Sequence, residues 1–402
     1  MKYVIVLGDG MADRPSKENG FKTALCAANL PAATQMAVSG EVGMVQTVPF
    51  GMKPGSDVAN LSVLGFDPSV YYTGRSPIEA LSMGIDFDLT DVTYRTNLVH
   101  LSNGVFGKDS RIMSHSAGDI TTAEAALLID AVAKEINSEF CQLFTGVSYR
   151  HCLILRNSNT GAELTPPHDV IGRPVSDNLP KGTHADLLID IMARAEKILE
   201  SHPVNVARKA RGLMTANSLW FWGEGRKPSL PDFATKYGIK GAMVSAVDLL
   251  KGIAVGSGMT VAEVEGATGN EHTNYAGKGQ AAIDLLADHD FVFVHVEAPD
   301  ECGHVGNAQG KVQAIENIDR QITQRLLDHA REQKVDLSVL FLPDHATPVE
   351  IMTHSGEAVP YVLWKSNDLK NNAGAQYNEE YASTTGNKFE SGEALIKHFL
   401  QK

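Results

Sequence analysis

The sequence has 402 residues, of which 43% are hydrophobic and 21% are charged, and it carries a formal net charge of −13. This length is enough for two or three domains, and the composition is that of an ordinary globular protein. The acidic balance argues against nucleic acid as a main partner, because phosphate backbones attract clustered Lys and Arg, but it leaves a small anionic ligand open.

The cysteines and the apolar start of the chain bear on its location. Four cysteines are scattered without a C-x-x-C pair, which favours a reducing compartment over a disulfide framework: Cys26, Cys141, Cys152 and Cys302. The apolar run of residues 3–7 is too short for a signal peptide or a membrane span, and Asp9 interrupts it. We therefore expect a cytoplasmic protein without a membrane partner, and leave its oligomeric state open.

Short apolar runs and helical patterns alternate along the chain. In chain order they are a strand at 3–7, helices at 121–138, 185–201 and 277–288, a strand at 291–296, a helix at 309–333 and a strand at 337–342. The strand runs are apolar throughout, which is typical of central strands covered by helices on both faces. The alternation predicts an α/β fold with a mostly parallel sheet.

The middle of the chain has a different pattern. Residues 92–101 and 152–156 alternate as half-buried strands do, and Pro- and Gly-rich joints occur at 165–174 and 178–183. We expect an inserted α+β domain at 71–215 and a discontinuous core formed by 1–70 and 216–402. The alternating Trp220 and Trp222 are interpreted as packing residues.

Three predicted strands end at a carboxylate. The first runs into Asp9 between two glycines, the second into Asp300, and the third into Asp344. Because ligands of an open α/β sheet bind beyond the carboxyl ends of its strands, these side chains should meet at one edge. Carboxylates brought together repel one another, so their pKa values rise unless a cation neutralises them. The set predicts a cation site, although a turn residue at Asp9 and a helix cap at Asp300 would explain each residue singly.

Histidines accompany two of these carboxylates. His304 lies four residues after Asp300, a spacing that places both on one face of a helical turn. His345 follows Asp344 directly, and His354 comes nine residues later. Aspartate oxygens together with imidazole nitrogens suit Zn²⁺, Mn²⁺ or a similar ion, whereas Mg²⁺ alone prefers oxygen ligands.

The segment PGSDVANLSVLGFDP, residues 54–68, offers a nucleophile. Ser56 precedes a short helical pattern, and a helix N-terminus favours an alkoxide or a bound phosphate. A metal ion on its oxygen would lower the pKa of the hydroxyl further. A plain N-cap serine fits the same spacing, so both roles of Ser56 stay open. Ser62 is a weaker candidate, because it falls inside the helical stretch.

Five motifs follow one another in the core: DGMAD at 9–13, PGSDVANLSVLGFDP at 54–68, PDECGH at 299–304, PDH at 343–345 and THSGEAVP at 353–360. In this order they resemble the alkaline-phosphatase superfamily, and more closely the archaeal-type 2,3-bisphosphoglycerate-independent phosphoglycerate mutases. The resemblance runs from the first strand to about residue 365. It implies an alkaline-phosphatase-like three-layer core that is interrupted by the inserted α+β domain.

The resemblance also implies two divalent metal ions (Mn²⁺, Zn²⁺ or Mg²⁺), a phosphoserine intermediate, and no need for 2,3-bisphosphoglycerate. Ser56 would be the catalytic residue that accepts the phosphoryl group. One ion would be bound by Asp300, His304 and His354, and the other by Asp9, Ser56, Asp344 and His345.

By the same resemblance, the inserted domain would close over the core and bind a carboxylate-bearing substrate. Arginine suits this task because its planar guanidinium pairs bidentately with carboxylate and phosphate. The SAGD segment at 116–119 matches the family only approximately, which leaves the identity of the substrate open. The candidate substrate-binding residues are Arg95, Arg111, Arg150, His151, Arg211, Arg226 and Lys251.

The leading expectation is interconversion of 3-phosphoglycerate and 2-phosphoglycerate. A second is phosphotransfer to a small acceptor such as homoserine, although the sequence has no G-x-x-x-x-G-K-[ST] loop for ATP. A phosphatase or sulfatase is a third, against which the large insert argues. A catalytically silent metal- or phosphate-binding module is a fourth, against which the complete set of candidate ligands argues.

Overall fold

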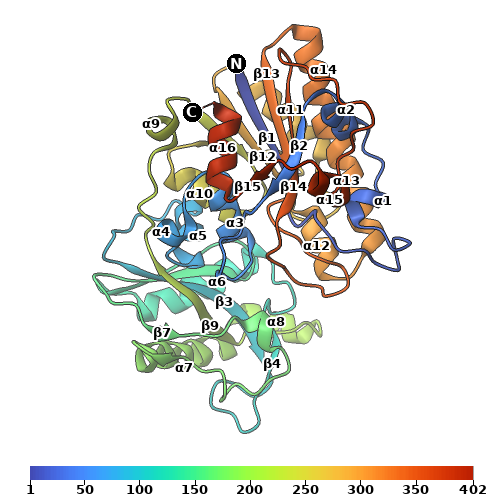
Figure 1. Cartoon of the computed structure of the whole chain (residues 1–402). Helices are drawn as coiled ribbons and strands as arrows, with labels where there is room; N and C mark the ends of the chain where they lie inside the picture. The colour runs from blue at the N-terminus through green and yellow to red at the C-terminus, as the bar shows by residue number, and fades with distance from the viewer. Residues whose placement is uncertain (402) are drawn as a thin grey trace. The chain divides into compact units, whose positions relative to one another are not determined.

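The computed structural model describes residues 1–401 and divides into two compact units (Figure 1). The larger unit comprises Met1–Tyr72 and Leu230–Lys402, and the smaller comprises Thr73–Ser229. The smaller unit extends past residue 215, where we placed its end, because strand β9 (Ser218–Arg226) pairs with β3 (Val92–Leu101) inside it. Trp220 and Trp222 of β9 are buried in the core of this unit, as expected of packing residues.

An eight-stranded, mostly parallel sheet forms the centre of the larger unit. Its strand order is β11-β10-β12-β1-β13-β14-β2-β15, with antiparallel pairing only where β14 meets β13 and β2. The strands are β1 (Lys2–Gly8), β2 (Glu41–Val45), β10 (Gly241–Val244), β11 (Thr260–Ala262), β12 (Phe291–Val296), β13 (Leu337–Leu342), β14 (Val359–Lys365) and β15 (Lys388–Phe389). Every residue of β12 and β13 is buried, which confirms that these apolar runs are central strands.

Helices pack around this sheet, and two of the predicted ones belong here. The helix expected at 277–288 is α11 (Tyr275–Leu285), while the pattern at 309–333 forms α13 (Ala308–Ile318), the π-helical turn η2 (Asp319–Thr323) and α14 (Gln324–Gln333). The other helices of this unit are α1 (Ala24–Ala27), α2 (Pro31–Ser39), α3 (Ser56–Val63), α4 (Pro68–Tyr71), α9 (Phe233–Tyr237), α10 (Asp248–Gly256), α12 (Ala298–His304), α15 (Glu379–Thr384) and α16 (Gly392–Leu400).

The π-helical turn η2 lies between α13 and α14 and carries Asp319, which contacts another helix. The Asp319 carboxylate, at the start of η2, accepts hydrogen bonds from the backbone N–H groups of Ala32 at 3.0 Å and Ala33 at 2.8 Å. These groups lie in the first turn of α2, where backbone N–H groups have no partner within the helix. Asp319 thereby caps a helix that lies far from it in the sequence.

The smaller unit has an antiparallel sheet in the order β4-β3-β6-β5, and β9 also pairs with β3. The helices expected at 121–138 and 185–201 are α6 (Thr122–Ile136) and α7 (Ala185–Ser201). The remaining elements are α5 (Arg75–Ser82), β4 (Ile112–Ser114), β5 (Cys141–Phe144), β6 (Arg150–Leu155), β7 (Ala162–Glu163), the 3₁₀ turn η1 (Pro167–Val170), β8 (Lys181–Gly182) and α8 (Pro203–Ala210). This composition is the α+β type expected for the insert.

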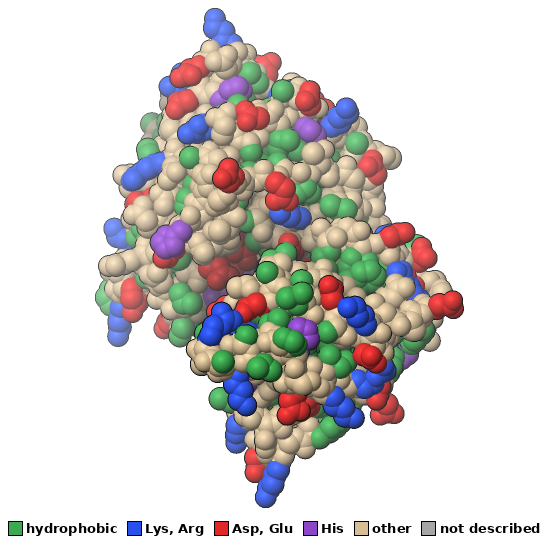
Figure 2. Space-filling model, turned by 180° about the vertical axis from the view of Figure 1, so that it is seen from behind, with side chains coloured by type: hydrophobic (Ala, Val, Ile, Leu, Met, Phe, Trp, Pro, Cys, Tyr) green, Lys and Arg blue, Asp and Glu red, His purple; other side chains and the backbone are tan. Residues whose placement is uncertain are grey.

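Charges of both signs share the surface. On the face shown in Figure 2, Lys and Arg side chains are interspersed with Asp and Glu side chains and do not gather into one large basic patch. Within residues 1–401, no helix combines the length and the apolar character that crossing a bilayer requires.

A buried lysine joins the ends of β1 and β13. Lys311, on α13, is fully buried and forms an ion pair of 3.1 Å with the Asp13 carboxylate. Its ammonium also donates hydrogen bonds to the carbonyl oxygens of Ala12 at 3.0 Å and Thr347 at 2.8 Å. Because Ala12 and Thr347 lie in the loops after β1 and β13, this side chain fixes two neighbouring strand ends.

Replacing Lys311 with methionine should destabilise the larger unit, because Asp13 would keep a buried charge without its partner. Removal of one member of a buried ion pair typically lowers the free energy of unfolding by about 3–5 kcal/mol. Urea denaturation measures the change, with Lys397→Met as the matched control. Lys397 is half exposed and pairs with Glu393 on α16, so its loss should lower stability by less than about 1 kcal/mol. Equal effects of the two substitutions would contradict this interpretation of Lys311.

A buried histidine in the smaller unit is held neutral. His151, in β6, accepts a hydrogen bond at Nδ1 from the backbone N–H of Gly146 at 3.1 Å. Burial lowers the pKa of His151 to about 3, and the charge of Arg150 acts in the same direction. The folded chain therefore keeps this imidazole uncharged in mildly acidic solution.

The neutral His151 should make folding acid-sensitive. In the unfolded chain His151 binds a proton at about pH 6.5, the ordinary pKa of histidine. The free energy of unfolding is therefore highest above that pH and falls by about 1.4 kcal/mol per pH unit as the pH drops toward the pKa of the folded state. Urea denaturation at pH 7 and pH 5 should therefore show that His151→Asn, whose amide oxygen can accept from Gly146, loses roughly 2 kcal/mol less than the wild type. His272→Asn, at an exposed position, should behave like the wild type. An unchanged pH dependence in His151→Asn would refute the assignment.

Candidate functional site

Three carboxylates meet at the carboxyl ends of adjacent strands. Asp9 follows β1, Asp300 lies in the first turn of α12 just after β12, and Asp344 follows β13. The order β12-β1-β13 makes these strands neighbours, and the parallel pairing of Gly8 with Val296 brings two of the ends level. All three side chains are almost completely buried. The structure thus gathers the carboxylates that follow predicted strands far apart in the sequence.

Asp300, His304 and His354 form the first group at this edge. Nε2 of His304 lies 3.1 Å from Asp300 Oδ2, and Nε2 of His354 lies 3.5 Å from Asp300 Oδ1. The two Nε2 atoms are 3.0 Å apart. Nδ1 of His304 lies 3.1 Å from the carbonyl oxygen of Met352, which can accept a hydrogen bond from the imidazole and so directs Nε2 toward the other two residues.

The electrostatics of the first group favour a positive charge between its three side chains. Burial opposes the charge of Asp300, but its contacts with His304 and His354 outweigh that effect and hold the pKa of Asp300 well below its ordinary value. The contact with Asp300 raises the pKa of His304 to about 9. One carboxylate and two imidazoles fit a divalent transition-metal ion, which would take the place of the proton.

Asp9, Asp344 and His345 form the second group. Nε2 of His345 lies 3.5 Å from Asp9 Oδ1 and 3.4 Å from Asp344 Oδ2. Asp344 Oδ1 accepts hydrogen bonds from the backbone N–H groups of Gly10 at 3.0 Å and His345 at 2.9 Å. Asn60 donates its side-chain amide to Asp344 Oδ2 at 2.8 Å. These contacts orient the Asp344 carboxylate toward Asp9 and His345.

Negative charge is concentrated in the second group. Burial raises the pKa of Asp9 well above that of an ordinary aspartate, and the carboxylate of Asp344 raises it further. Burial likewise raises the pKa of Asp344 and lowers the pKa of His345. Two buried carboxylates beside a neutral imidazole fit a divalent cation, because the cation would remove their repulsion.

The hydroxyl of Ser56 points into the second group. Ser56 is the first residue of α3, and its Oγ lies 3.4 Å from Asp9 Oδ1 and 3.2 Å from His345 Nε2. Gly55 occupies the N-cap position, so the Ser56 side chain does not cap the helix. The competing Ser62 is buried, and its hydroxyl accepts a hydrogen bond from the backbone N–H of Gly392 at 3.1 Å. Of the two serines, Ser56 is the one that lies among the carboxylates.

Two polar residues at this edge escaped the sequence reasoning. The Asn60 amide donates to the Ser56 carbonyl oxygen at 2.9 Å as well as to Asp344. The Thr347 hydroxyl donates to Asp300 Oδ1 and lies 3.3 Å from His345 Nδ1. Neither residue type by itself indicates a functional site. The only signals in the sequence are that Asn60 lies four residues after Ser56 and that Thr347 lies two residues after His345.

His295 is a third residue that the sequence reasoning missed. It is fully buried in β12, with Nε2 2.8 Å from Asp9 Oδ2 and Nδ1 3.2 Å from the Ser245 hydroxyl. Glu297 lies next to it, with Oε2 3.5 Å from His295 Nε2. A single imidazole within the apolar run FVFVHV is the signal that could have identified His295.

Most of the candidate anion-binding residues already have partners within the protein. His151 is neutral, as described above. Four of the six cationic candidates bind a carbonyl or carboxylate group of the protein. Arg111 donates to the Gly172 carbonyl, Arg226 donates to the Ser158 carbonyl, Arg211 pairs with Glu124, and Lys251 pairs with Glu263.

The two remaining candidates belong to a cationic cluster of the smaller unit. Arg95 and Arg75 both contact Oε1 of Glu79, the latter at 2.9 Å, and the guanidinium of Arg95 lies 4.6 Å from the ring centre of Trp222. Burial opposes the charge of Glu79, but Arg95, Arg75 and Arg150 together hold its pKa below its ordinary value. Arg95, Arg75 and Arg150 bring three positive charges to this cluster, and clustered positive charge attracts an anion. Arg75 was not among the expected residues.

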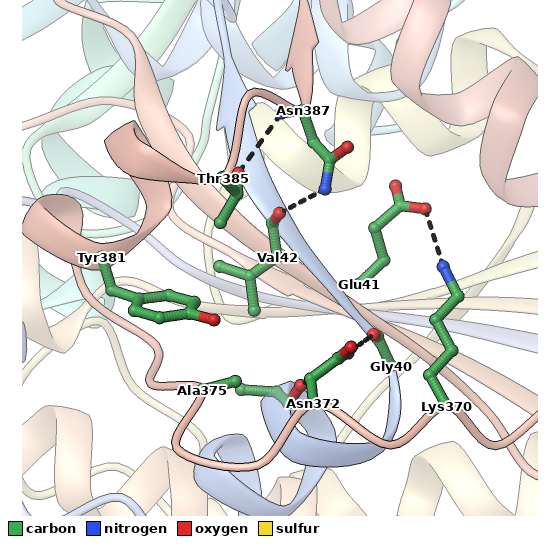
Figure 3. A pocket seen from close by; sticks show the side chains of 10 residues that line it. Gly40, Glu41, Val42, Lys370, Asn372, Ala375, Tyr381, Thr385 and Asn387 are labelled. Carbon is green, nitrogen blue, oxygen red and sulfur yellow. Dashed lines mark hydrogen bonds and ion pairs between the residues drawn. The ribbon is translucent and has the colours of Figure 1, made fainter.

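A pocket beside β2 in the larger unit has a different character (Figure 3). Its polar side chains bind neighbouring groups of the lining: Glu41 pairs with Lys370 at 3.2 Å, and the Asn387 amide donates to the Val42 carbonyl at 2.8 Å. None of the carboxylate–imidazole groups lines it. The strand edge, and not this pocket, carries the candidate chemistry.

Comparison with known proteins links this site to a family. Residues 37–205 match the family described as 2,3-bisphosphoglycerate-independent phosphoglycerate mutase. A protein of that name from Methanosarcina barkeri is 45% identical over 384 residues, which cover 95% of each chain. A probable 2,3-bisphosphoglycerate-independent phosphoglycerate mutase from Geobacter sulfurreducens is 43% identical over 403 residues, which cover 100% of each chain.

Solved structures agree with the sequence comparison. A protein from Pyrococcus horikoshii matches with a TM-score of 0.82 at 29% identity, covering 100% of this chain and 96% of that one. A cofactor-independent phosphoglycerate mutase from Thermoplasma acidophilum matches with a TM-score of 0.65 at 27% identity, covering 100% and 99%. The chain, similar to these relatives over nearly its whole length, belongs to the family of 2,3-bisphosphoglycerate-independent phosphoglycerate mutases.

Proposed function

We propose that this protein interconverts 3-phosphoglycerate and 2-phosphoglycerate through a phosphoserine at Ser56, without 2,3-bisphosphoglycerate. The observation that carries the proposal is the Ser56 hydroxyl at the head of α3, 3.4 Å from Asp9 and 3.2 Å from His345. The names of the relatives favour a mutase over transfer to homoserine, over a phosphatase and over a silent binding module. The four cysteines are free, which supports action in a reducing compartment such as the cytoplasm.

Two divalent ions would be held by the two groups at the strand edge. Mn²⁺ and Zn²⁺ fit better than Mg²⁺ because each group contains imidazole nitrogen. When bound, the ions would supply positive charge to the phosphoryl oxygens and favour the alkoxide form of Ser56. The proposed ligands are Asp300, His304 and His354 for one ion, and Asp9, Ser56, Asp344 and His345 for the other.

The chain's own groups position the reacting atoms. Ser56 begins α3, so the positive end of that helix lies at the nucleophile and favours negative charge there. Asn60 holds the Ser56 backbone by its carbonyl oxygen, which limits rotation of the first helical turn. Positioning and charge neutralisation of this kind supply most of the catalysis in phosphoryl transfer.

The phosphoryl group is transferred in two steps. In the first, the bond between phosphorus and the substrate oxygen breaks as the bond from phosphorus to Ser56 Oγ forms, and the proton from Ser56 ends on the freed glycerate hydroxyl. In the second, the other hydroxyl of glycerate attacks phosphorus, the bond from phosphorus to Ser56 Oγ breaks, and the proton lost by the attacking hydroxyl ends on Ser56 Oγ. Water must be excluded between the two steps, because it would hydrolyse the phosphoserine.

We further propose that the cationic cluster of the smaller unit binds the substrate carboxylate. The support is the positive charge of Arg75, Arg95 and Arg150, which together lower the pKa of Glu79. An arginine that pairs with carboxylate contributes geometry as well as charge. Within the broader set of candidates this proposal favours Arg95 and Arg150, and it adds Arg75.

Ser56→Ala should remove mutase turnover. With Mn²⁺ and 3-phosphoglycerate, and without ATP or 2,3-bisphosphoglycerate, the wild type should form 2-phosphoglycerate that is detected by coupling to enolase. Loss of the nucleophile should lower kcat by at least about 10⁴-fold and abolish the phosphoenzyme. Ser62→Ala, in the same helix, should keep both the turnover and the phosphoenzyme.

Two results would contradict this proposal in different ways. A wild type that forms no 2-phosphoglycerate but phosphorylates homoserine with ATP would exclude the mutase. A Ser56→Ala variant with wild-type turnover would leave the mutase standing and exclude Ser56 as its nucleophile.

Arg150→Gln should weaken substrate binding and spare the chemical step. A hydrogen bond to a charged group contributes about 1.5–3 kcal/mol, so KM for 3-phosphoglycerate should rise about 10- to 100-fold, with a much smaller change in kcat. Steady-state kinetics measure both constants. Arg194→Gln, at an exposed ion pair with Asp190 on α7, is the control and should leave KM unchanged. A KM for Arg150→Gln equal to that of the control would exclude a role in binding substrate.

A further inference from the structure

Thr347 is, within residues 1–401, the one side chain outside the two proposed metal groups that is within hydrogen-bonding distance of both. It is fully buried in the loop after β13. Its hydroxyl donates to Asp300 Oδ1 in the first group and lies 3.3 Å from His345 Nδ1 in the second. Thr347 lies outside both neighbouring motifs, PDH at 343–345 and THSGEAVP at 353–360.

The directions of these two hydrogen bonds follow from proton count. A hydroxyl has one proton, and an ionised carboxylate can only accept, so the Thr347 proton is directed to Asp300. Thr347 Oγ1 can then only accept from His345, which places the imidazole proton on Nδ1. The lone pair of His345 therefore lies on Nε2, the atom that faces Ser56, Asp9 and Asp344.

The surrounding chain holds Thr347 in this position from several sides. Its backbone N–H donates to the Ala12 carbonyl at 3.2 Å, and its carbonyl accepts from Lys311 at 2.8 Å. A Cβ at Gly10 would overlap the Thr347 hydroxyl and lie 2.5 Å from Asp300 Oδ1, while a Cβ at Gly303 would lie 2.8 Å from the Thr347 methyl group. Both glycines leave space that the threonine side chain and its partners occupy.

We propose that Thr347 is a positioning residue that couples the two metal sites, by orienting Asp300 in one and fixing the tautomer of His345 in the other. This inference rests on the metal ligands of the proposed function. Outer groups that orient metal ligands typically change metal affinity by about 10- to 100-fold when they are removed. Because a single hydroxyl serves both groups, its loss should weaken both sites together.

Mn²⁺ binding to the purified full-length protein tests the proposal without any measurement of activity. Calorimetric titration of the chelator-treated wild type should show two bound ions. Thr347→Val, which keeps the shape and removes the hydroxyl, should weaken both sites by about 10-fold or more. Thr347→Ser, which restores the hydroxyl, should bind within about threefold of the wild type at both sites.

Thr323→Val is the matched control. Thr323 is also fully buried in the larger unit, in η2, and its hydroxyl has no hydrogen-bond partner within residues 1–401. The same substitution there should leave Mn²⁺ binding unchanged. Thermal unfolding of each variant in the presence of chelator shows whether the variant is folded, and so whether a lower Mn²⁺ affinity comes from loss of the hydroxyl or from loss of the fold.

Several outcomes would overturn the role of Thr347. They are Mn²⁺ affinities of Thr347→Val equal to those of Thr323→Val, weakening of one site alone, or a Thr347→Ser variant as impaired as Thr347→Val. If Thr347→Val does not fold, Thr347→Ser and Thr347→Ala differ by the hydroxyl alone and carry the same comparison. A wild type that binds no Mn²⁺ would instead reject the metal sites of the proposed function.

Discussion

Buried negative charge at the ends of β12, β1 and β13 is the constraint on which the larger unit depends. Asp9, Asp300 and Asp344 are enclosed at the edge of a sheet whose central strands are apolar. An isolated ionised carboxylate is strongly disfavoured in such surroundings unless it is neutralised or paired. Positive charge at this edge would offset that cost, and this is the physical basis of the proposed cation sites.

The groups behind the proposed ligands are mostly neutral hydrogen-bonding partners. The Met352 carbonyl turns His304, the Asn60 amide holds Asp344, and the His295 ring contacts Asp9. Neutral partners can orient a ligand atom without competing with a cation for the central position. The left-handed backbone of Gly10, with φ of 56°, lets its N–H reach Asp344 while leaving room for Asp300.

The sequence reveals the parts of this arrangement that depend on pattern. Apolar runs predicted the central strands, and strand-end carboxylates pointed to one edge, because parallel strands bring their carboxyl ends together. Contacts that depend on the fold could not be predicted: Thr347 meets Asp300 only because α12, which follows β12, lies against the loop after β13. The partners of the arginines depend on the fold in the same way, since a guanidinium such as that of Arg226 can be bound by a backbone carbonyl that carries no signal in the sequence.

Two buried lysines show why the permanent charges of the protein do not suffice at this edge. Lys311 donates to the Ala12 and Thr347 carbonyls, and Lys278 donates to the His295 carbonyl at 3.0 Å. Both ammonium groups donate to backbone oxygens at the strand ends, and Lys311 also forms an ion pair with the Asp13 carboxylate. They therefore fix the loops that carry the ligands and cannot bridge the carboxylates to a phosphoryl group. That task would fall to the proposed divalent ions, because a metal ion can bind oxygen atoms on both sides at once.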